Sequence, residues 1–134
     1  MTHLSTLLGR FGLAFIFIVS GLGKLGAGYA GTQQYMEAMG VPGALLPLVI
    51  LAEIGGGTAI AAGFLTRWAA LGLAVFSIAS GVLFHYQPSD PMQMISFMKN
   101  LAIGGGFLVL AAHGAGALSV DGWLAKRAGK AGAP

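Results

Sequence analysis

Four long apolar segments, separated by short polar stretches, dominate the pattern of hydrophobic and polar positions along this chain. They cover about residues 4–25, 45–64, 68–85 and 94–113. Each is close to the roughly 20 helical residues that cross a hydrocarbon core about 30 Å thick. None alternates apolar and polar residues, as the strands of a membrane β-barrel would. The pattern therefore predicts an all-α integral membrane bundle of four transmembrane helices, built as a single domain over residues 1–134.

The longest polar interruption, residues 26–47, lies between the first two apolar segments. It contains the run TQQYMEAM at residues 32–39, followed by the chain breakers Gly40, Pro42 and Pro47. A short helix that ends in a turn is typical of this order of residues. We therefore expect a short interfacial helix between the first two spans.

The other links are short. Residues 63–67 join the second and third segments, so these two helices should be antiparallel neighbours. A polar loop at residues 86–91, which contains two prolines, precedes the fourth segment, and the tail 114–134 carries an amphipathic piece at about residues 120–128. We expect the first segment to be kept as a span, because it lacks the charged start of a cleaved secretory signal.

Lysine and arginine predict the orientation, since positively charged residues favour the cytoplasmic side of a membrane. With four spans, both chain ends lie on one side. That side holds most of the cations, namely Arg10, Arg67, Lys126, Arg127 and Lys130, whereas only Lys24 and Lys99 lie toward the other. The sequence therefore predicts cytoplasmic termini.

Composition supports a membrane protein and excludes several other classes. Hydrophobic residues make up 56% of the chain and charged residues only 8%, and the mean hydropathy is +0.81. A soluble globule of this size needs more polar surface than this. The cations lie at segment ends, which indicates orientation and not a nucleic-acid surface. Cysteine is absent, so any redox role would need a cofactor, a lipid-soluble carrier or a partner.

One carboxylate, that of Glu53, lies inside a predicted span, where a charged side chain costs free energy. Glu53 stands roughly 12 Å inside the second span, counted at 1.5 Å per residue, so it must be protonated or paired. Lys99 enters the fourth span from the same side and is the first candidate partner, with Lys24 as the second. His85 ends the third span at a similar depth. These groups predict either a structural ion pair that fixes which helices are neighbours or a functional site.

Two triple glycines lie inside the second and fourth spans, at residues 55–57 and 104–106. Small residues let membrane helices approach closely and could also favour homo-oligomers. The alternative is that Gly56 and Gly105 form flat walls of a pocket for a ring compound. We expect no metal site, because the acidic and histidine residues lack paired ligand spacings and cysteine is absent.

Five motifs together resemble the DoxX family of small bacterial membrane proteins, over nearly the whole chain. They are GLGKL at residues 21–25, GVP at 40–42, EIGGG at 53–57, GFLTRWAA at 63–70 and FMKNLA at 97–102. The resemblance implies a four-helix bundle in the bacterial inner membrane, and an association with oxidoreductase systems. Related proteins include a quinone-reactive subunit of thiosulfate oxidation and proteins linked to thiol and oxidative-stress defence.

The resemblance also carries the family's polar positions onto this chain, at Lys24, Glu53, Arg67, Lys99 and Asn100. It implies a membrane subunit of a quinone-linked oxidoreductase system that takes electrons from a protein partner. In this hypothesis Glu53, Lys99 and His85 transfer protons, while Lys24, Asn100, Gly56 and Gly105 hold the quinone. The alternatives are a non-catalytic scaffold or assembly factor for a partner, and a solute or proton pathway, for which one bundle is too small unless it oligomerises.

Overall fold

Four helical spans, two further helices and no strand make up the part of the chain that the computed structural model describes, residues 2–131. The first span is α1 (Thr2–Gly23) and the fourth is α6 (Pro91–His113). The second, Gly43–Ala62, consists of η1 (Gly43–Leu45), α3 (Leu46–Ile50), η2 (Leu51–Gly56) and α4 (Gly57–Ala62). The third, Thr66–His85, consists of α5 (Thr66–Ser80) and η3 (Gly81–His85). All four are long and apolar enough to cross a membrane.

The predicted four-span bundle is therefore confirmed, with each helix beginning two or three residues earlier than expected. Capping explains the early start of α6, because the carboxylate of Asp90 accepts hydrogen bonds from the backbone N–H groups of Met92 and Gln93. Pro91 then occupies the first helical position, where its missing N–H costs nothing. An 11-residue helix, α2 (Gly28–Ala38), joins the first two spans. Its place at the membrane interface stays a prediction.

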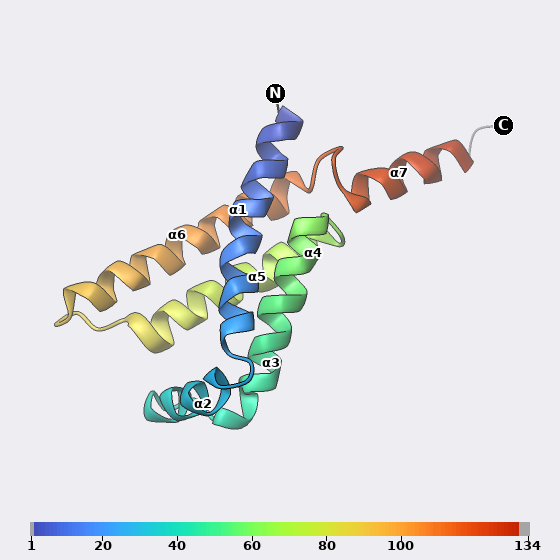
Figure 1. Cartoon of the computed structure of the whole chain (residues 1–134). Helices are drawn as coiled ribbons and strands as arrows, with labels where there is room; N and C mark the ends of the chain where they lie inside the picture. The colour runs from blue at the N-terminus through green and yellow to red at the C-terminus, as the bar shows by residue number, and fades with distance from the viewer. Residues whose placement is uncertain (1, 132–134) are drawn as a thin grey trace.

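The spans form two pairs (Figure 1). α1 packs along η2 and α4, whereas α5 and η3 pack along α6. The pairs meet in the half of the bundle that holds residue 2 and the C-terminal helix α7 (Val120–Ala131). The apolar core lies there and comprises Ala14, Phe17, Ile60, Ala70, Leu73, Ala74, Phe107, Leu110 and Ala111. Toward α2 and the loop before α6 the two pairs diverge.

Glycines set the close approaches within and between the pairs. A Cβ on Gly57 would lie 2.9 Å from Ile18 of α1, and one on Gly104 would lie 2.9 Å from Ile78 of α5. A Cβ on Gly56 would lie 3.0 Å from Leu73. These three glycines therefore serve helix packing, as small residues do in membrane bundles.

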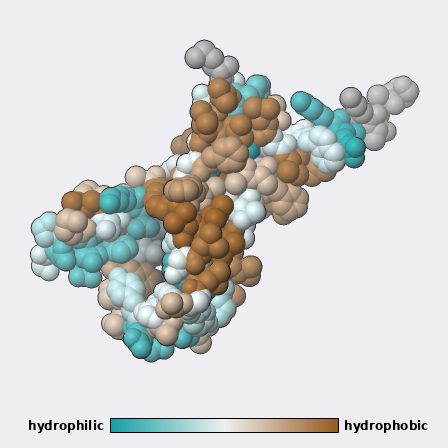
Figure 2. Space-filling model, viewed as in Figure 1, coloured by the Kyte–Doolittle hydropathy of each residue, from teal (hydrophilic) through white to brown (hydrophobic). Residues whose placement is uncertain are grey.

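Large apolar side chains cover the outside of the spans. Phe15, Val75 and Val109, on three different spans, are 70%, 68% and 61% exposed. Figure 2 shows hydrophobic residues running down the face of the bundle over α1, with hydrophilic residues at its extremities. A contiguous apolar surface of this kind is suited to contact with lipid chains.

Candidate functional site

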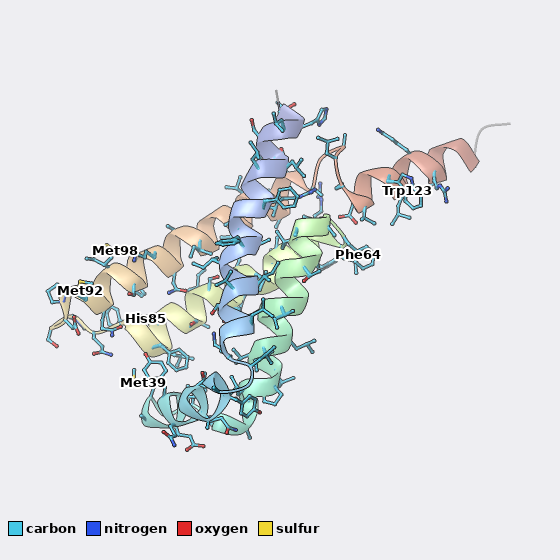
Figure 3. All side chains as sticks on the ribbon, in the orientation of Figure 1. Met39, Phe64, His85, Met92, Met98 and Trp123 are labelled. Carbon is cyan, nitrogen blue, oxygen red and sulfur yellow. The ribbon has the colours of Figure 1, made fainter. Side chains whose placement is uncertain are left out.

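A cavity of about 450 Å³ lies between the two helix pairs, in the half of the bundle where they diverge. Each of the four spans lines it, and so does α2. Figure 3 shows one of its residues, His85, at the opposite end of the α5/η3 segment from Phe64 and Trp123, which lie near α7. The volume is within the range of roughly 300–1,000 Å³ found for small-molecule sites.

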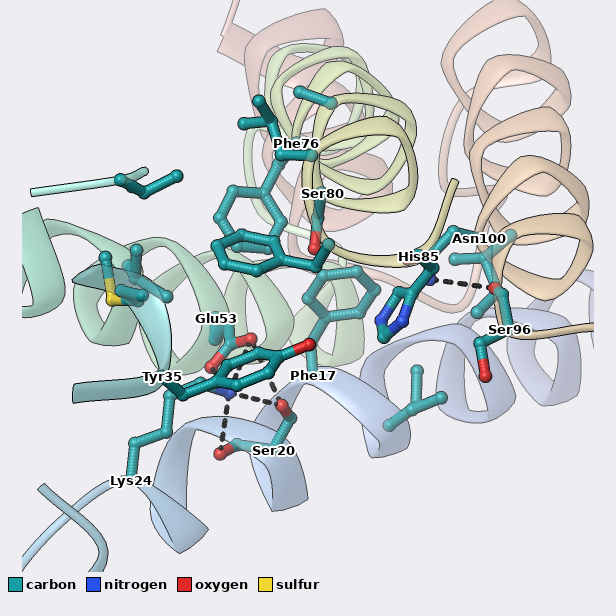
Figure 4. Close-up of a pocket in the computed structure, with 18 of the residues that line it drawn as sticks. Phe17, Ser20, Lys24, Tyr35, Glu53, Phe76, Ser80, His85, Ser96 and Asn100 are labelled. Carbon is teal, nitrogen blue, oxygen red and sulfur yellow. Dashed lines mark hydrogen bonds and ion pairs between the residues drawn. The ribbon is translucent and has the colours of Figure 1, made fainter. Parts of the chain in front are cut away.

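The polar centre of the cavity is an ion pair between α1's end and η2. Lys24 Nζ lies 2.9 Å from Glu53 Oε2 and donates a hydrogen bond of 3.0 Å to Oε1. The hydroxyl of Ser20 donates to the same Oε1 at 3.1 Å and lies 2.7 Å from the lysine nitrogen. Figure 4 shows the three side chains converging. Glu53 is 5% exposed, so this buried carboxylate is paired, as the bilayer argument requires.

Lys99, the first candidate partner of Glu53, lies on the opposite wall of the cavity and is exposed. Within residues 2–131 it makes no hydrogen bond or ion pair. The expected Glu53–Lys99 pair is therefore wrong, and Lys24 is the partner. The physical reason is the helix pairing, because η2 packs on α1, whereas α6, which carries Lys99, packs on α5 and η3.

The wall opposite the ion pair carries the other polar groups. His85 Nδ1 lies 2.7 Å from Gln93 Oε1, an interaction that orients the imidazole beside the cavity. Asn100 donates to the carbonyl of Ser96 at 3.0 Å. Of the seven residues predicted for the site, the structure thus brings Glu53, Lys24, His85, Lys99 and Asn100 to one cavity.

Both π-helical turns of the spans border this cavity. Glu53 lies in η2 and His85 ends η3. A π-turn holds one residue more per turn than an α-helix, which rotates the following side chains and is frequent at functional sites. Sequence periodicity of 3.6 residues cannot reveal such a turn.

Comparison with known proteins places this architecture in a family. The DoxX family model matches residues 5–86. The chain belongs to the DoxX family. It is 53% identical over 127 residues to inner membrane protein YqjF of Escherichia coli K12, covering 95% of this chain and 97% of that protein. It is 35% identical over 122 residues to inner membrane protein YphA of the same organism, covering 86% of each. No solved structure matches.

The two similar proteins are named as inner membrane proteins. Their names agree with the four apolar spans of this DoxX protein and its lipid-facing surface. The chain is therefore a multi-pass membrane protein in contact with the lipid bilayer.

Aromatic residues that the sequence analysis did not select make up much of this DoxX protein's cavity. Phe17, Tyr35, Phe76 and Phe84 line it. Tyr35 of α2 stacks on Phe84 at 5.5 Å between ring centroids, and Phe17 meets Phe76 edge-to-face at 6.1 Å. Ser20 was also missed, although its position four residues before Lys24 places both on one helix face, a signal that was available.

Two predicted cavity residues lie elsewhere. Gly56 packs against Leu73, whereas a Cβ built on Gly105 would meet no other part of the described chain within 4 Å, apart from its chain neighbours and the backbone of its own helix. Gly105 is exposed. Neither lines the cavity, so the idea that they form flat walls for a ring is wrong. Among the described residues, no group of three or more His, Cys, Asp or Glu could hold a metal ion.

A second polar centre of this DoxX protein lies at the other end of the bundle, around Arg10. Its side chain is 1% exposed. The guanidinium donates to the carbonyls of Ala115 at 2.8 Å, Leu118 at 3.0 Å and Ala61 at 3.2 Å. α1 projects past the end of α4 (Figure 1), and the hydrogen bond to Ala61 places the Arg10 guanidinium at that helix end. It satisfies a free carbonyl at the C-terminus of α4, where a cation also suits the helix dipole.

Asp121 connects α7 to the same centre. Its carboxylate accepts the backbone N–H groups of Leu65 and Thr66, each at 2.9 Å, and thereby caps α5 from a distant part of the chain. Partial burial alone would raise the pKa of Asp121, but the hydrogen bonds from Thr66 and Leu65 and the attraction of Arg10 outweigh it and hold the pKa below its ordinary value. From the sequence, Arg10 indicates only the orientation of the chain, and nothing in the sequence predicts this second polar centre.

Proposed function

We propose that this DoxX protein is a membrane subunit of an oxidoreductase system and that its cavity binds the ring of a quinone. One observation carries the proposal, namely the buried Lys24–Ser20–Glu53 group at one wall of a cavity that is otherwise largely aromatic and aliphatic. Ligand sites of this composition hold a ring by apolar contact and orient it with a few polar groups. The aromatic side chains of Tyr35 and Phe84 supply stacking surface.

The chemistry of a quinone fits the polar groups on both walls. Reduction to the quinol takes up two electrons and two protons at the two ring oxygens. Glu53 and His85 lie on opposite walls and are groups that exchange protons, which general acid–base transfer to ring oxygens requires. Lys99, which has no ion-pair partner among residues 2–131, adds a cation that favours a developing negative charge on a ring oxygen. Since the chain has no cysteine that could donate electrons, we propose that a protein partner donates them to the quinone.

Glu53→Gln should abolish quinone retention, because the amide keeps the size of the side chain but loses the charge that holds Lys24. The measurement is mass spectrometry of organic extracts of the purified protein, with about one quinone expected per wild-type chain. Glu37→Gln is the matched control, since Glu37 is exposed and does not line the cavity. The control should retain quinone like the wild type.

A non-catalytic scaffold is the second candidate. The observation that favours it is that Lys24 and Glu53 link the end of α1 to η2, so the pair could serve only to hold these two elements together. A blank extract from wild type and both variants would reject the quinone proposal in favour of a scaffold. Co-purification of one protein without quinone would support that outcome.

We also propose that the side holding residue 2 and α7 faces the cytoplasm, as the excess of positive charge on that side indicates. The chain has no native cysteine, so a single introduced thiol reports one position. In intact cells, Ser89→Cys should react with a membrane-impermeant thiol reagent and Gly129→Cys should react only after lysis. The reverse labelling pattern would invert the orientation and leave the cavity proposal untouched.

A further inference from the structure

The corner between α4 and α7 is a surface that the proposed function does not use. A shallow apolar groove runs there, lined by Ile54, Thr58, Ala59 and Ala62 of the second span, by Phe64, and by Val120 of α7. α7 is tied to the end of the span, because Asp121 N–H donates to the carbonyl of Gly63 at 2.9 Å. The groove thus descends along a spanning helix and ends beneath the first turn of α7.

The apolar side of α7 continues this groove. Val120, Trp123 and Leu124 follow the i, i+3, i+4 spacing of one helix face, and they are 37%, 51% and 44% exposed. Figure 3 shows Trp123 below α7, on the side where Phe64 projects from the end of α4. Because these side chains stay partly exposed, an outside molecule can contact both arms of the corner.

The free charges beside this apolar face are positive. The carboxylate of Asp121 is engaged by the N–H groups of Leu65 and Thr66. Lys126 and Arg127 lie on the exposed surface, and the Arg127 guanidinium stands 4.1 Å from the centre of the Trp123 ring. The corner therefore combines an apolar groove at span depth with an indole and two cations at the span's end.

We propose that this corner is a binding site for an anionic phospholipid. One acyl chain lies in the groove along Ile54 to Phe64, and the headgroup phosphate meets Lys126 and Arg127 beside the indole of Trp123. The depth of each contact supports a lipid and not a soluble protein, because Thr58 and Ile54 lie roughly 6–12 Å along the helix from its end, inside the hydrocarbon region. Amphipathic helices with tryptophan and basic residues bind membrane surfaces in this way, and each cation adds to the attraction of anionic lipid.

Trp123 provides the probe. The chain has two tryptophans, so Trp68→Phe leaves Trp123 as the single indole. This variant is reconstituted in vesicles of phosphatidylcholine that contain increasing fractions of brominated phosphatidylglycerol or of brominated phosphatidylcholine, whose bromines quench an indole on contact. We expect brominated phosphatidylglycerol to reach half-maximal quenching at a several-fold lower fraction than brominated phosphatidylcholine. The substitutions Lys126→Gln and Arg127→Gln each remove one positive charge. Each should reduce the preference for the anionic lipid by about fivefold.

A groove variant separates a specific site from general lipid contact. Thr58→Phe places a ring in the groove and should weaken quenching by the anionic lipid. Val75→Phe is the matched control, because Val75 is 68% exposed on another span and its ring would meet bulk lipid. Equal quenching by the two lipids, or a preference that survives the double neutralisation, would overturn the proposal and leave the corner as ordinary lipid-facing surface.

Discussion

Arg10→Met should lower the stability of the detergent-solubilised protein by about 3 kcal/mol or more, because each buried carbonyl left without a donor costs about 1–3 kcal/mol. The guanidinium serves three carbonyls at once, on Ala61, Ala115 and Leu118. A methionine fills similar volume but donates nothing. Thermal unfolding followed by circular dichroism measures the loss.

Two further variants make the Arg10 prediction specific. Arg10→Lys should lie between wild type and Arg10→Met, since an ammonium keeps the charge but cannot present the planar set of donors of a guanidinium. Arg67→Met, at an exposed arginine on the same side of the bundle, should change the melting temperature little. Similar losses from Arg10→Met and Arg67→Met would show that general positive charge, and not the buried hydrogen bonds, is what matters.

Glu53→Gln and Lys24→Met should each destabilise the protein by about 1–3 kcal/mol, and the double variant should lose less than the sum by about 1 kcal/mol or more. The cost stays below that of a fully buried pair because the Lys24 side chain is 21% exposed and can turn toward water. Chemical or thermal unfolding of the four proteins of the cycle in one detergent gives the coupling energy.

Lys99 supplies the comparison for this cycle. It lies on the cavity wall opposite Glu53 and shares no hydrogen bond with it. Glu53→Gln and Lys99→Met should therefore add within roughly 0.5 kcal/mol. Coupling between Glu53 and Lys99, with additivity for Lys24, would reverse the assignment of the ion pair.

The number and position of the spans followed from the sequence because apolar length decides them. The partner of Glu53 did not, because it depends on which helices are neighbours. Lys24 and Lys99 both line the cavity, and the packing of η2 on α1 selects Lys24. Depth is readable from a sequence, whereas helix adjacency in a four-helix bundle is a tertiary property.

For the glycines, too, the sequence predicts one property and leaves another to the tertiary structure. Small residues inside apolar segments correctly indicated close helix packing, as at Gly57 and Gly104. Which glycine of a triplet faces a neighbour depends on helix rotation, and the π-turn at η2 alters that rotation. On α6, Gly105 faces outward while its immediate neighbour Gly104 packs against α5, because successive residues of a helix point about 100° apart.

Arg10 was missed because its partners are backbone carbonyls, which leave no residue signature. They belong to segments 51, 105 and 108 positions away along the chain. Complementary side chains can be recognised in a sequence, but loop carbonyls that accept hydrogen bonds from a buried arginine cannot. The same holds for Asp121, which caps α5 from 55 positions away.

The distant partners of Arg10 have a consequence for biosynthesis. A chain is made from its N-terminus, so α1 reaches the membrane before the residues from 115 to 118 have left the ribosome. Until then the guanidinium lacks two of its three acceptors, and an unsatisfied arginine is held near the water interface. The first helix can reach its final depth only when the last loop has been synthesised, so chains truncated before residue 115 should remain loosely packed in the membrane, exposed to quality-control proteases.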